Sequence, residues 1–358
     1  MSLLNSTKRY MVGLSGCVDS ATTCALLQSQ GHKVQPIFMH NWEEDDHCHI
    51  SDDIAECEAV CNHLSLDLEV INFQQDYFNE VFEHSLQLLQ QGLTPNPDIM
   101  CNSRIKFQLL SQHAQANGYD ALATGHYAHT ETRDGQIALI QAPDPIKDQT
   151  YFLSQLTQDQ LSYAYFPLGQ YSKSQTRDMA QNFQLPNAHR KDSVGICFVG
   201  NRKFDQFLQQ YLLTRPGDMM TTDGLVVGQH AGLFCYTIGQ RKGLGIGGVK
   251  HSSPTPWYVI EKDLPQNQLI VSQDESLLLK HHIQLEPIHW IRGIPETTQL
   301  KAKLRHGPDF INVTVDPATN HVTFHQPQQA PTPGQHIVFY LDDECLGGGM
   351  ILTAHNHD

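Results

Sequence analysis

Short apolar runs alternate with helical patterns along the first two hundred residues of the chain. The runs predict strands at residues 10–15, 34–39, 68–73 and 121–124. Apolar positions that recur every three or four residues predict helices at residues 20–30, 53–64 and 203–213. Because the connections are short, this alternation favours parallel strand–helix–strand units, and therefore an α/β fold built on a doubly wound parallel sheet.

The pattern changes at Arg215-Pro-Gly-Asp218, where helical periodicity nearly disappears. Nine of the 25 glycines lie between Gly217 and Gly248. Alternating apolar and polar positions predict β-strands at residues 257–260, 269–271, 310–315 and 336–340. We therefore expect three domains: an α/β domain over residues 1–214, a small β-rich central domain over 215–275, and a C-terminal β-barrel domain over 276–358.

The composition is that of an ordinary folded protein with an acidic balance. The 358 residues are 40% hydrophobic and 17% charged, and 23 Lys and Arg against 38 Asp and Glu give a net charge of −15. This balance argues against a disordered chain and against a protein that coats nucleic acid through its overall charge. Nucleic-acid binding through a local patch stays open, because basic residues gather at Arg190-Lys191, Arg202-Lys203, Arg241-Lys242 and Lys301-Ala-Lys303-Leu-Arg305.

The sequence also indicates a compartment. It has no run of about 18 apolar residues that would span a membrane, and no signal-peptide pattern. Nine cysteines, an odd number in a long chain without a secretion signal, indicate reduced thiols in the cytoplasm. Cys57 and Cys61 lie at helical spacing with Val60 and Leu64, so we interpret them as core residues and expect no protein-ligated metal.

A candidate anion site follows the first predicted strand. Residues 14–20, Leu-Ser-Gly-Cys-Val-Asp-Ser, connect that strand to the first helix. The unpaired N–H groups and the positive dipole end of a helix N-terminus attract phosphate, and small residues such as Ser15 and Gly16 let the backbone approach it. No Gly-Lys-Ser/Thr follows, so the segment is not a mononucleotide P-loop. A plain strand–turn–helix junction with Asp19 or Ser20 as N-cap is the alternative.

Two cysteines lie in segments that suit thiol chemistry. Cys101 follows the proline-stiffened Thr94-Pro-Asn-Pro-Asp98 and comes just before a helix predicted over residues 103–117. A helix N-terminus lowers the pKa of a thiol and favours the thiolate, and Asp98 is close enough in sequence to transfer protons. Cys197 lies in a short apolar run, where a buried cysteine that only packs is the alternative.

Residues 14–20 resemble the Ser-Gly-Gly-x-Asp-Ser pyrophosphatase loop of enzymes that cleave ATP to AMP and pyrophosphate while they adenylate a substrate. The loop departs from that pattern at Cys17, where those enzymes have their second glycine. If the position needs a positive φ, a cysteine is strained there by about 1–3 kcal/mol. At an ordinary φ the cysteine is tolerated.

Further segments, in order from residue 10 to residue 352, resemble the tRNA-specific 2-thiouridylase (MnmA/TrmU) family, with Val194 where the family usually has threonine. They are residues 41–46, 94–102, 123–127, 147–153, 166–169, 195–198, 236–248 and 345–350. The resemblance implies an adenine-nucleotide alpha-hydrolase-like ATP-pyrophosphatase domain, which is catalytic, followed by two small β-rich domains, the last a β-barrel.

The family's functional positions map onto this chain one by one. The resemblance implies that ATP is bound by Gly13, Leu14, Ser15, Gly16, Cys17, Val18, Asp19, Ser20, Met39 and Gly125. It implies that the target base meets Asn96, Pro97 and Asp98, and that the catalytic residues are Cys101, Cys197 and Asp98. It implies tRNA contacts at His126, Lys147, Asp148, Gln149, Arg305, His306 and Gln335.

The resemblance also implies a reaction, the ATP-dependent 2-thiolation of the wobble uridine in tRNAs for lysine, glutamate and glutamine. ATP with Mg²⁺ would adenylate the C2 oxygen. Sulfur would come from a persulfide on Cys197, either directly or as hydrosulfide released by Cys101, and a Cys101–Cys197 disulfide would remain. A sulfur-relay protein or a cysteine desulfurase would load Cys197, and the enzyme would act as a cytoplasmic monomer.

Three alternatives stay open. An amidating synthetase of the same superfamily would need an amine-donor site in place of two reactive thiols. A tRNA-binding relic would have lost its ATP chemistry through Cys17. An iron–sulfur cluster held by Asp98, Cys101 and Cys197 is the third alternative.

Overall fold

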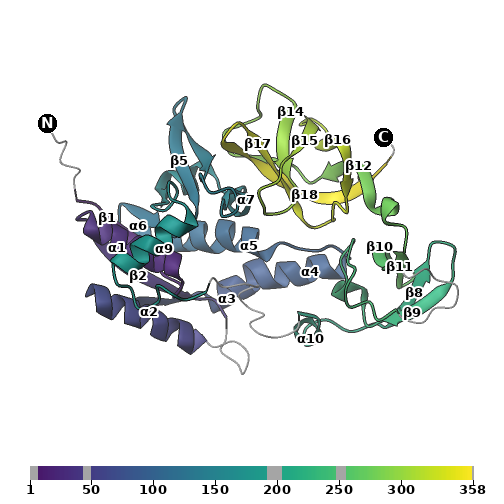
Figure 1. The fold of residues 1–358 in the computed structure, drawn as a ribbon, viewed down its shortest axis with the longest axis horizontal. Coiled ribbons are helices and arrows are strands. Elements are labelled where there is room, and N and C mark those ends of the chain that lie inside the picture. The colour runs from purple at the N-terminus through teal and green to yellow at the C-terminus, as the bar shows by residue number, and fades with distance from the viewer. Residues whose placement is uncertain (1–6, 43–49, 192–203, 247–254, 357–358) are drawn as a thin grey trace.

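The computed structural model describes residues 7–42, 50–191, 204–246 and 255–356 (Figure 1). Cys197, Val194 and the basic pair Arg202-Lys203 lie outside the described residues. An α/β domain is followed by a small β domain and a closed β-barrel, which confirms the predicted fold class. Within the described ranges, no helix has the length and apolar character needed to cross a membrane.

The first domain is built on a parallel sheet with the strand order β3-β2-β1-β4-β7. Its strands are β1 (Arg9–Gly13), β2 (Lys33–His40), β3 (Glu69–Asn72), β4 (Ala121–Ala123) and β7 (Ala164–Tyr165). Along β1, Met11 packs in one core cluster while Tyr10 and Val12 pack in another, so apolar side chains cover both faces of the sheet. Burial on both faces explains why these strands are continuous apolar runs in the sequence.

Helices cover both faces of this sheet. On the side of Tyr10 lie α1 (Val18–Ser29), α2 (Ile50–Leu64) and α9 (Lys173–Asn182). Cys57 and Cys61 are buried in that cluster, as expected of core residues. On the side of Met11 lie α3 (Gln74–Tyr77), the π-helical η1 (Phe78–Glu83), α4 (His84–Gln90), α5 (Pro97–Met100), the π-helical η2 (Cys101–Leu110), α6 (Ser111–Ala116), α7 (Thr150–Leu153), α8 (Gln158–Tyr163) and α10 (Phe204–Leu208).

Two helices differ from the sequence-based prediction. The helix expected over residues 103–117 begins at Pro97, because Asn96 caps it by accepting a hydrogen bond from the Ile99 N–H at 3.3 Å. The helix expected over 203–213 ends at Leu208, and the residues after it form turns.

A hairpin of the first domain, β5 (Ala128–Arg133) and β6 (Gln136–Gln141), is an element that the sequence pattern did not predict. Its second strand pairs with β18 of the barrel, where Leu139 lies opposite Cys345 and Ile140 opposite Glu344. The hairpin therefore extends the sheet of the last domain, and the chain's first and last domains share backbone hydrogen bonds.

The central domain is a small sheet with the strand order β10-β11-β8-β9. Its elements are β8 (Gly217–Thr221), β9 (Val226–His230), η3 (Leu233–Cys235), β10 (Tyr258–Asp263) and β11 (Gln268–Ser272). Met219, Val259 and Leu269 are fully buried at its centre, so the domain has a core of its own.

The last domain is a six-stranded barrel, closed because β12 pairs with both β16 and β18. Its elements are η4 (Glu275–Leu278), β12 (Leu279–Leu285), β13 (His289–Trp290), β14 (Gln299–Lys303), β15 (Ile311–Asp316), β16 (His321–Gln329), β17 (His336–Leu341) and β18 (Glu344–His355). Inward-facing residues such as Ile283, Val313 and Phe339 fill it, so closure leaves a packed interior.

A buried ion pair holds the barrel against the α/β domain. Lys303 Nζ, at the end of β14, lies 3.0 Å from Asp148 Oδ2, and the two side chains are 1% and 0% exposed. Thr150 donates its hydroxyl to the same carboxylate at 2.9 Å. With the domains in contact, removal of either partner would leave the other as a buried, unpaired charge, which is strongly unfavourable.

Removing one charge of this ion pair should lower the free energy of unfolding. Lys303→Met should lower the free energy of unfolding by about 3–5 kcal/mol, because the Asp148 carboxylate stays buried without a cation. Lys303→Met combined with Asp148→Asn should lose less, because both charges are gone. Urea unfolding followed by circular dichroism measures both, and equal losses would show that the orphaned carboxylate is not the cause.

Candidate nucleotide and thiol site

The strand order places a switch point beside β1. The chain continues from β1 to β2 and β3 on one side, then to β4 and β7 on the other. In open α/β sheets, ligands bind where the loops diverge at such a point. Residues 14–17 follow β1 and Gly125 follows β4, so both predicted nucleotide segments lie at this edge. An ideal Cβ on Gly125 would lie only 2.9 Å from the Ser20 nitrogen, so the two loops are in close contact.

Residues 14–20, the predicted phosphate loop, bend at Gly16, which has a φ of +74°. This conformation favours glycine, and an ideal Cβ there would also lie 2.9 Å from Arg190 Nη1, so a side chain would displace that guanidinium. Cys17 has a φ of −78° and a ψ of 156°, extended values that any residue adopts, and it is the N-cap of α1. The residue that departs from the family's loop pattern therefore carries no backbone strain.

Side chains from the loop and from a distant segment hold the loop in shape. Ser20 Oγ accepts a hydrogen bond from the Ser15 N–H at 3.2 Å. Asn187 Nδ2 and Arg190 Nη1 both donate to the Gly16 carbonyl oxygen, at 2.8 and 3.1 Å. Sequence analysis missed Asn187, and it weighed Arg190 only as part of a basic pair, because neither lies near the loop in the chain.

Asp19 is bound by two groups from other segments. Lys173 Nζ lies 2.7 and 2.8 Å from the two carboxylate oxygens, and Tyr127 donates its hydroxyl to one of them at 2.9 Å. Lys173 is the first residue of α9, directly after the capping residue Ser172. A cation in the first turn opposes the helix dipole. That mismatch is the sequence signal for a further role of Lys173, which our sequence analysis did not use.

The remaining residues predicted to bind ATP lie at the same edge. Gly13 ends β1, and the Leu14 N–H donates to the Ile37 carbonyl oxygen at 2.8 Å. Val18 begins α1, and Met39 is the last residue but one of β2 and partly buried. The predicted residues thus lie at or near the carboxyl ends of β1, β2 and β4, with Met39 packed on the face of the sheet opposite α1.

Cys101 lies within a continuous helical stretch. Pro97 opens this stretch, and α5 passes directly into the π-helical η2, whose first residue is Cys101. The thiol is therefore one turn beyond the helix N-terminus, and the residue is only 7% exposed. π-helical turns are frequent at functional sites.

The Lys106 ammonium acts on two of the predicted site residues, Asp98 and His126. Burial raises the pKa of Asp98, and the nearby Lys106 ammonium offsets part of that effect. Burial and the same ammonium lower the pKa of His126, so its imidazole is neutral at pH 7. Thr124 Oγ1 lies 2.8 Å from Nδ1 of that imidazole. Sequence analysis missed Lys106, because no motif marks it.

Residues predicted to contact tRNA come from two domains and meet where these domains adjoin. His306 Nε2 lies 3.0 Å from the Asp148 carbonyl oxygen, and its ring lies 4.9 Å from that of Phe152. Arg305 beside it is exposed, and Lys147 is half-buried. The Asp148 side chain is 0% exposed, so it supports this surface from within rather than facing RNA.

Two glutamines that were predicted to contact tRNA form hydrogen bonds with the protein's own backbone. Gln149 Oε1 accepts a hydrogen bond from the Tyr127 N–H at 3.0 Å. Gln335 Nε2 donates to the carbonyl oxygens of Thr94 and Pro95, at 2.8 and 3.0 Å. In this structure both side-chain amides therefore serve the protein's own main chain.

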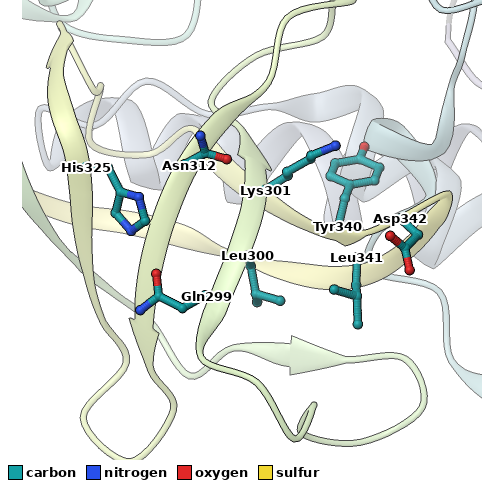
Figure 2. Close-up of a pocket in the computed structure, with 8 residues that line it drawn as sticks. All are labelled: Gln299, Leu300, Lys301, Asn312, His325, Tyr340, Leu341 and Asp342. Carbon is teal, nitrogen blue, oxygen red and sulfur yellow. The ribbon is translucent and has the colours of Figure 1, made fainter.

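A separate pocket of about 210 Å³ lies on the barrel (Figure 2). It is lined by Gln299, Leu300, Lys301, Asn312, His325, Tyr340, Leu341 and Asp342. None of these is a predicted catalytic or nucleotide-binding residue, so the pocket is distinct from the site above. Among the residues that the structure describes, no group of three or more His, Cys, Asp or Glu side chains could hold a metal ion.

Family models match the chain from residue 8 to residue 351. The tRNA methyl transferase HUP domain matches residues 8–201, the tRNA methyl transferase PRC-barrel domain residues 205–273, and the aminomethyltransferase beta-barrel domain residues 280–351. A tRNA-specific 2-thiouridylase MnmA of Pseudomonas aeruginosa is 43% identical over 98% of this chain and 96% of its own. The one from Pseudomonas fluorescens is 45% identical over 97% and 95%. The chain belongs to the tRNA-specific 2-thiouridylase family.

Membership of the tRNA-specific 2-thiouridylase family confirms the resemblance found in the sequence. Similarity to solved structures is much weaker. A 4-thiouridine synthetase–RNA complex with bound ATP covers 57% of this chain and 49% of its own, with a TM-score of 0.35 and 13% identity, which is too low to argue from.

In this tRNA-specific 2-thiouridylase family member, Gly16 should tolerate change less than Cys17. Gly16→Ala should lower the free energy of unfolding by about 1–3 kcal/mol, because alanine is strained at a φ of +74° and meets Arg190. Cys17→Gly should change it by less than about 1 kcal/mol, because Cys17 has an ordinary φ. Denaturant unfolding of both variants measures this. A Cys17→Gly protein clearly more stable than the parent would indicate strain at Cys17 after all.

Proposed function

We propose that this protein catalyses the ATP-dependent 2-thiolation of the wobble uridine in tRNAs for lysine, glutamate and glutamine, with AMP and pyrophosphate as further products. The observation that carries the proposal is the sheet edge where residues 14–20 meet Gly125, in the same domain as Asp98 and Cys101. The 43–45% identity to curated 2-thiouridylases over almost their full length supports this reaction class.

We assign activation of the uracil base by ATP to residues 14–20, the predicted phosphate loop. The C2 oxygen of uracil is a poor leaving group, and adenylation lets it leave as part of AMP. The C2 oxygen attacks the α-phosphorus of ATP, and the bond to the pyrophosphate breaks. The N–H groups at the start of α1 and the hydroxyls of Ser15 and Ser20 would hold the phosphates. Lys173 places a cation at the same loop through Asp19, and ATP would arrive with Mg²⁺.

Sulfur then enters as a nucleophile. The terminal sulfur of a persulfide on Cys197 attacks C2, and AMP leaves. The Cys101 thiolate attacks the Cys197 sulfur, the persulfide S–S bond breaks, and the terminal sulfur stays on C2. The two cysteines end as a disulfide that an external thiol reduces. Release of hydrosulfide by Cys101 before the attack gives the same products, and Asp98 is our candidate for the proton transfers.

RNA docking is proposed where the first domain and the barrel adjoin. Lys147 and Arg305 supply positive charge there despite the overall −15, and His306 contacts the main chain of Asp148, next to Gln149 in sequence, across the two domains. The wobble base would have to leave its stack to reach Asn96 and the Cys101 thiol, as bases do in other base-modifying enzymes. A sulfur-relay protein or a cysteine desulfurase would reload Cys197 in the cytoplasm, and we propose a monomer.

The other readings are less well supported. A relic disabled by Cys17 lacks its main argument, because that residue has an ordinary φ. The reaction of an amidating synthetase would not use the thiol of Cys101, which follows Asp98 by three residues in the sequence. The iron–sulfur alternative depends on Cys197, which lies outside the described residues.

The reaction should be visible directly. Thiolation-deficient tRNA incubated with the protein, ATP, Mg²⁺, cysteine, a cysteine desulfurase and a reductant should yield 2-thiouridine, measured by nucleoside mass spectrometry. Cys101→Ser should abolish the product, while Cys235→Ser in the central domain should retain it. Absence of 2-thiouridine with a folded, tRNA-binding protein would make the relic the leading interpretation.

The affinity for tRNA should fall steeply with salt, because phosphate contacts release counterions. Between 50 and 200 mM salt, we expect a loss of about tenfold or more, measured by fluorescence anisotropy. Arg305→Ala should weaken binding and flatten the salt dependence, whereas Arg9→Ala, at the start of β1, should change neither. A salt-independent affinity would contradict docking through phosphates.

A further inference from the structure

Residues 92–95, which we call the strap, connect α4 to the helix that carries Asp98 and Cys101. Figure 1 shows α4 running below the barrel toward the central domain. Both C-terminal domains bind the strap, although it belongs to the first domain. The strap is therefore a physical connection between the two accessory domains and the thiol segment.

The barrel holds the strap by its main chain. The Thr94 N–H donates to the Pro333 carbonyl oxygen at 2.9 Å, and Gln335 Nε2 donates to the carbonyl oxygens of Thr94 and Pro95. Gly334, between the two barrel residues, has a φ of +92°, and an ideal Cβ there would lie 2.5 Å from the Thr94 nitrogen. Only a glycine allows the two backbones to approach this closely.

The central domain holds the other end of the strap. Lys262 Nζ donates to the Gly92 carbonyl oxygen at 3.0 Å. Leu264 packs against Gly92, with Cδ1 3.0 Å from an ideal Cβ at that glycine. Lys262 therefore ties the central domain to the first residue of the strap.

The chain between the strap and the thiol is stiff. Pro95 and Pro97 fix their own φ angles and keep the residues before them out of the helical region. Asn96 between them caps α5 through the Ile99 N–H. A displacement of the strap is therefore passed to the helix that contains Cys101, because few rotatable bonds remain to absorb it.

In this arrangement, the side-chain amide of Gln335 donates its hydrogens to the strap and not to RNA. Its Nε2 carries two hydrogens, and the two strap carbonyl oxygens accept one each. RNA could reach only the remaining oxygen. This differs from the role in tRNA contact that the family resemblance implies for the same residue.

We propose that Gln335 is a positioning residue, which sets the place of Asp98 and Cys101 through the strap and so couples the position of the barrel to the reacting thiol. The proposal rests on the proposed function, because it assigns Cys101 to the thiolation reaction. The proposal gives Gln335 a different role from Lys147 and Arg305, which we propose attract RNA by their positive charge.

Gln335→Met, which keeps the size of the side chain and removes its donors, tests the proposal. The matched control is Gln284→Met, because Gln284 Nε2 also donates to backbone carbonyl oxygens, at 2.7 Å to Thr319 and 3.3 Å to Asn320, but only inside the barrel. In the thiolation assay, Gln335→Met should lower kcat by about tenfold to a hundredfold, since small misplacements of reacting groups cost that much. KM and Kd for tRNA should stay within about twofold of the parent, and the control should match the parent in all three.

A second measurement needs neither tRNA nor ATP. Alkylation of Cys101 by iodoacetamide, followed peptide by peptide with mass spectrometry, should be about fivefold or more faster in Gln335→Met, since the loss of two hydrogen bonds loosens the segment. Cys345, buried in the barrel, should label at the parent rate in both variants.

Each outcome supports or overturns the proposal. A raised Kd for tRNA with unchanged kcat and unchanged labelling of Cys101 would make Gln335 an RNA contact and overturn it. Faster labelling of Cys345 as well would show general loosening of the barrel and also overturn it. If the parent protein makes no 2-thiouridine, the proposed function fails, while the labelling of Cys101 still decides whether Gln335 positions the segment.

Discussion

The buried ion pair between Asp148 and Lys303 is the interaction on which the arrangement of domains depends. It joins a loop of the α/β domain to a barrel strand, and both side chains are almost completely withdrawn from water. A charge buried in this way needs its partner, so the pair allows one docking arrangement and penalises others. That arrangement brings His306 against the main chain of Asp148, next to Lys147 in sequence, and seats the barrel on the chain segment before Cys101.

Further contacts make the same connection at the sheet. The β5–β6 hairpin pairs with β18, so backbone hydrogen bonds run from one domain into the other. At the outer end of this pairing, Arg292 and Arg133 both bind Glu344, at 3.0 and 3.3 Å. These partly exposed pairs add little stability one by one, and their value is in fixing the register of the two domains. The protein is therefore one assembly in which the barrel and the central domain shape the α/β domain's site.

The phosphate loop shows how a change in a motif can be absorbed. The bend of the loop lies at Gly16, which has the positive φ and the close neighbours, while Cys17 has extended dihedral angles. The residues that hold the loop come from later segments, with Lys173 and Tyr127 on Asp19 and Asn187 and Arg190 on Gly16. The geometry of the loop thus depends more on these tertiary contacts than on the identity of the residue at position 17.

Periodicity alone was sufficient for four of the five strands of the parallel sheet, its first two helices and the β-rich C-terminal half, because burial of apolar faces imposes periods of two and 3.6 residues. The place of the phosphate loop was also visible, since a strand followed by small residues and a helix start is a local pattern. Lys173 and Arg190 acquired their partners only in the folded chain, because those partners come from segments far away in sequence. The same holds for Asp148 and Gln335, whose side chains face the protein: burial and hydrogen bonding are properties of the surroundings, which a linear sequence does not contain.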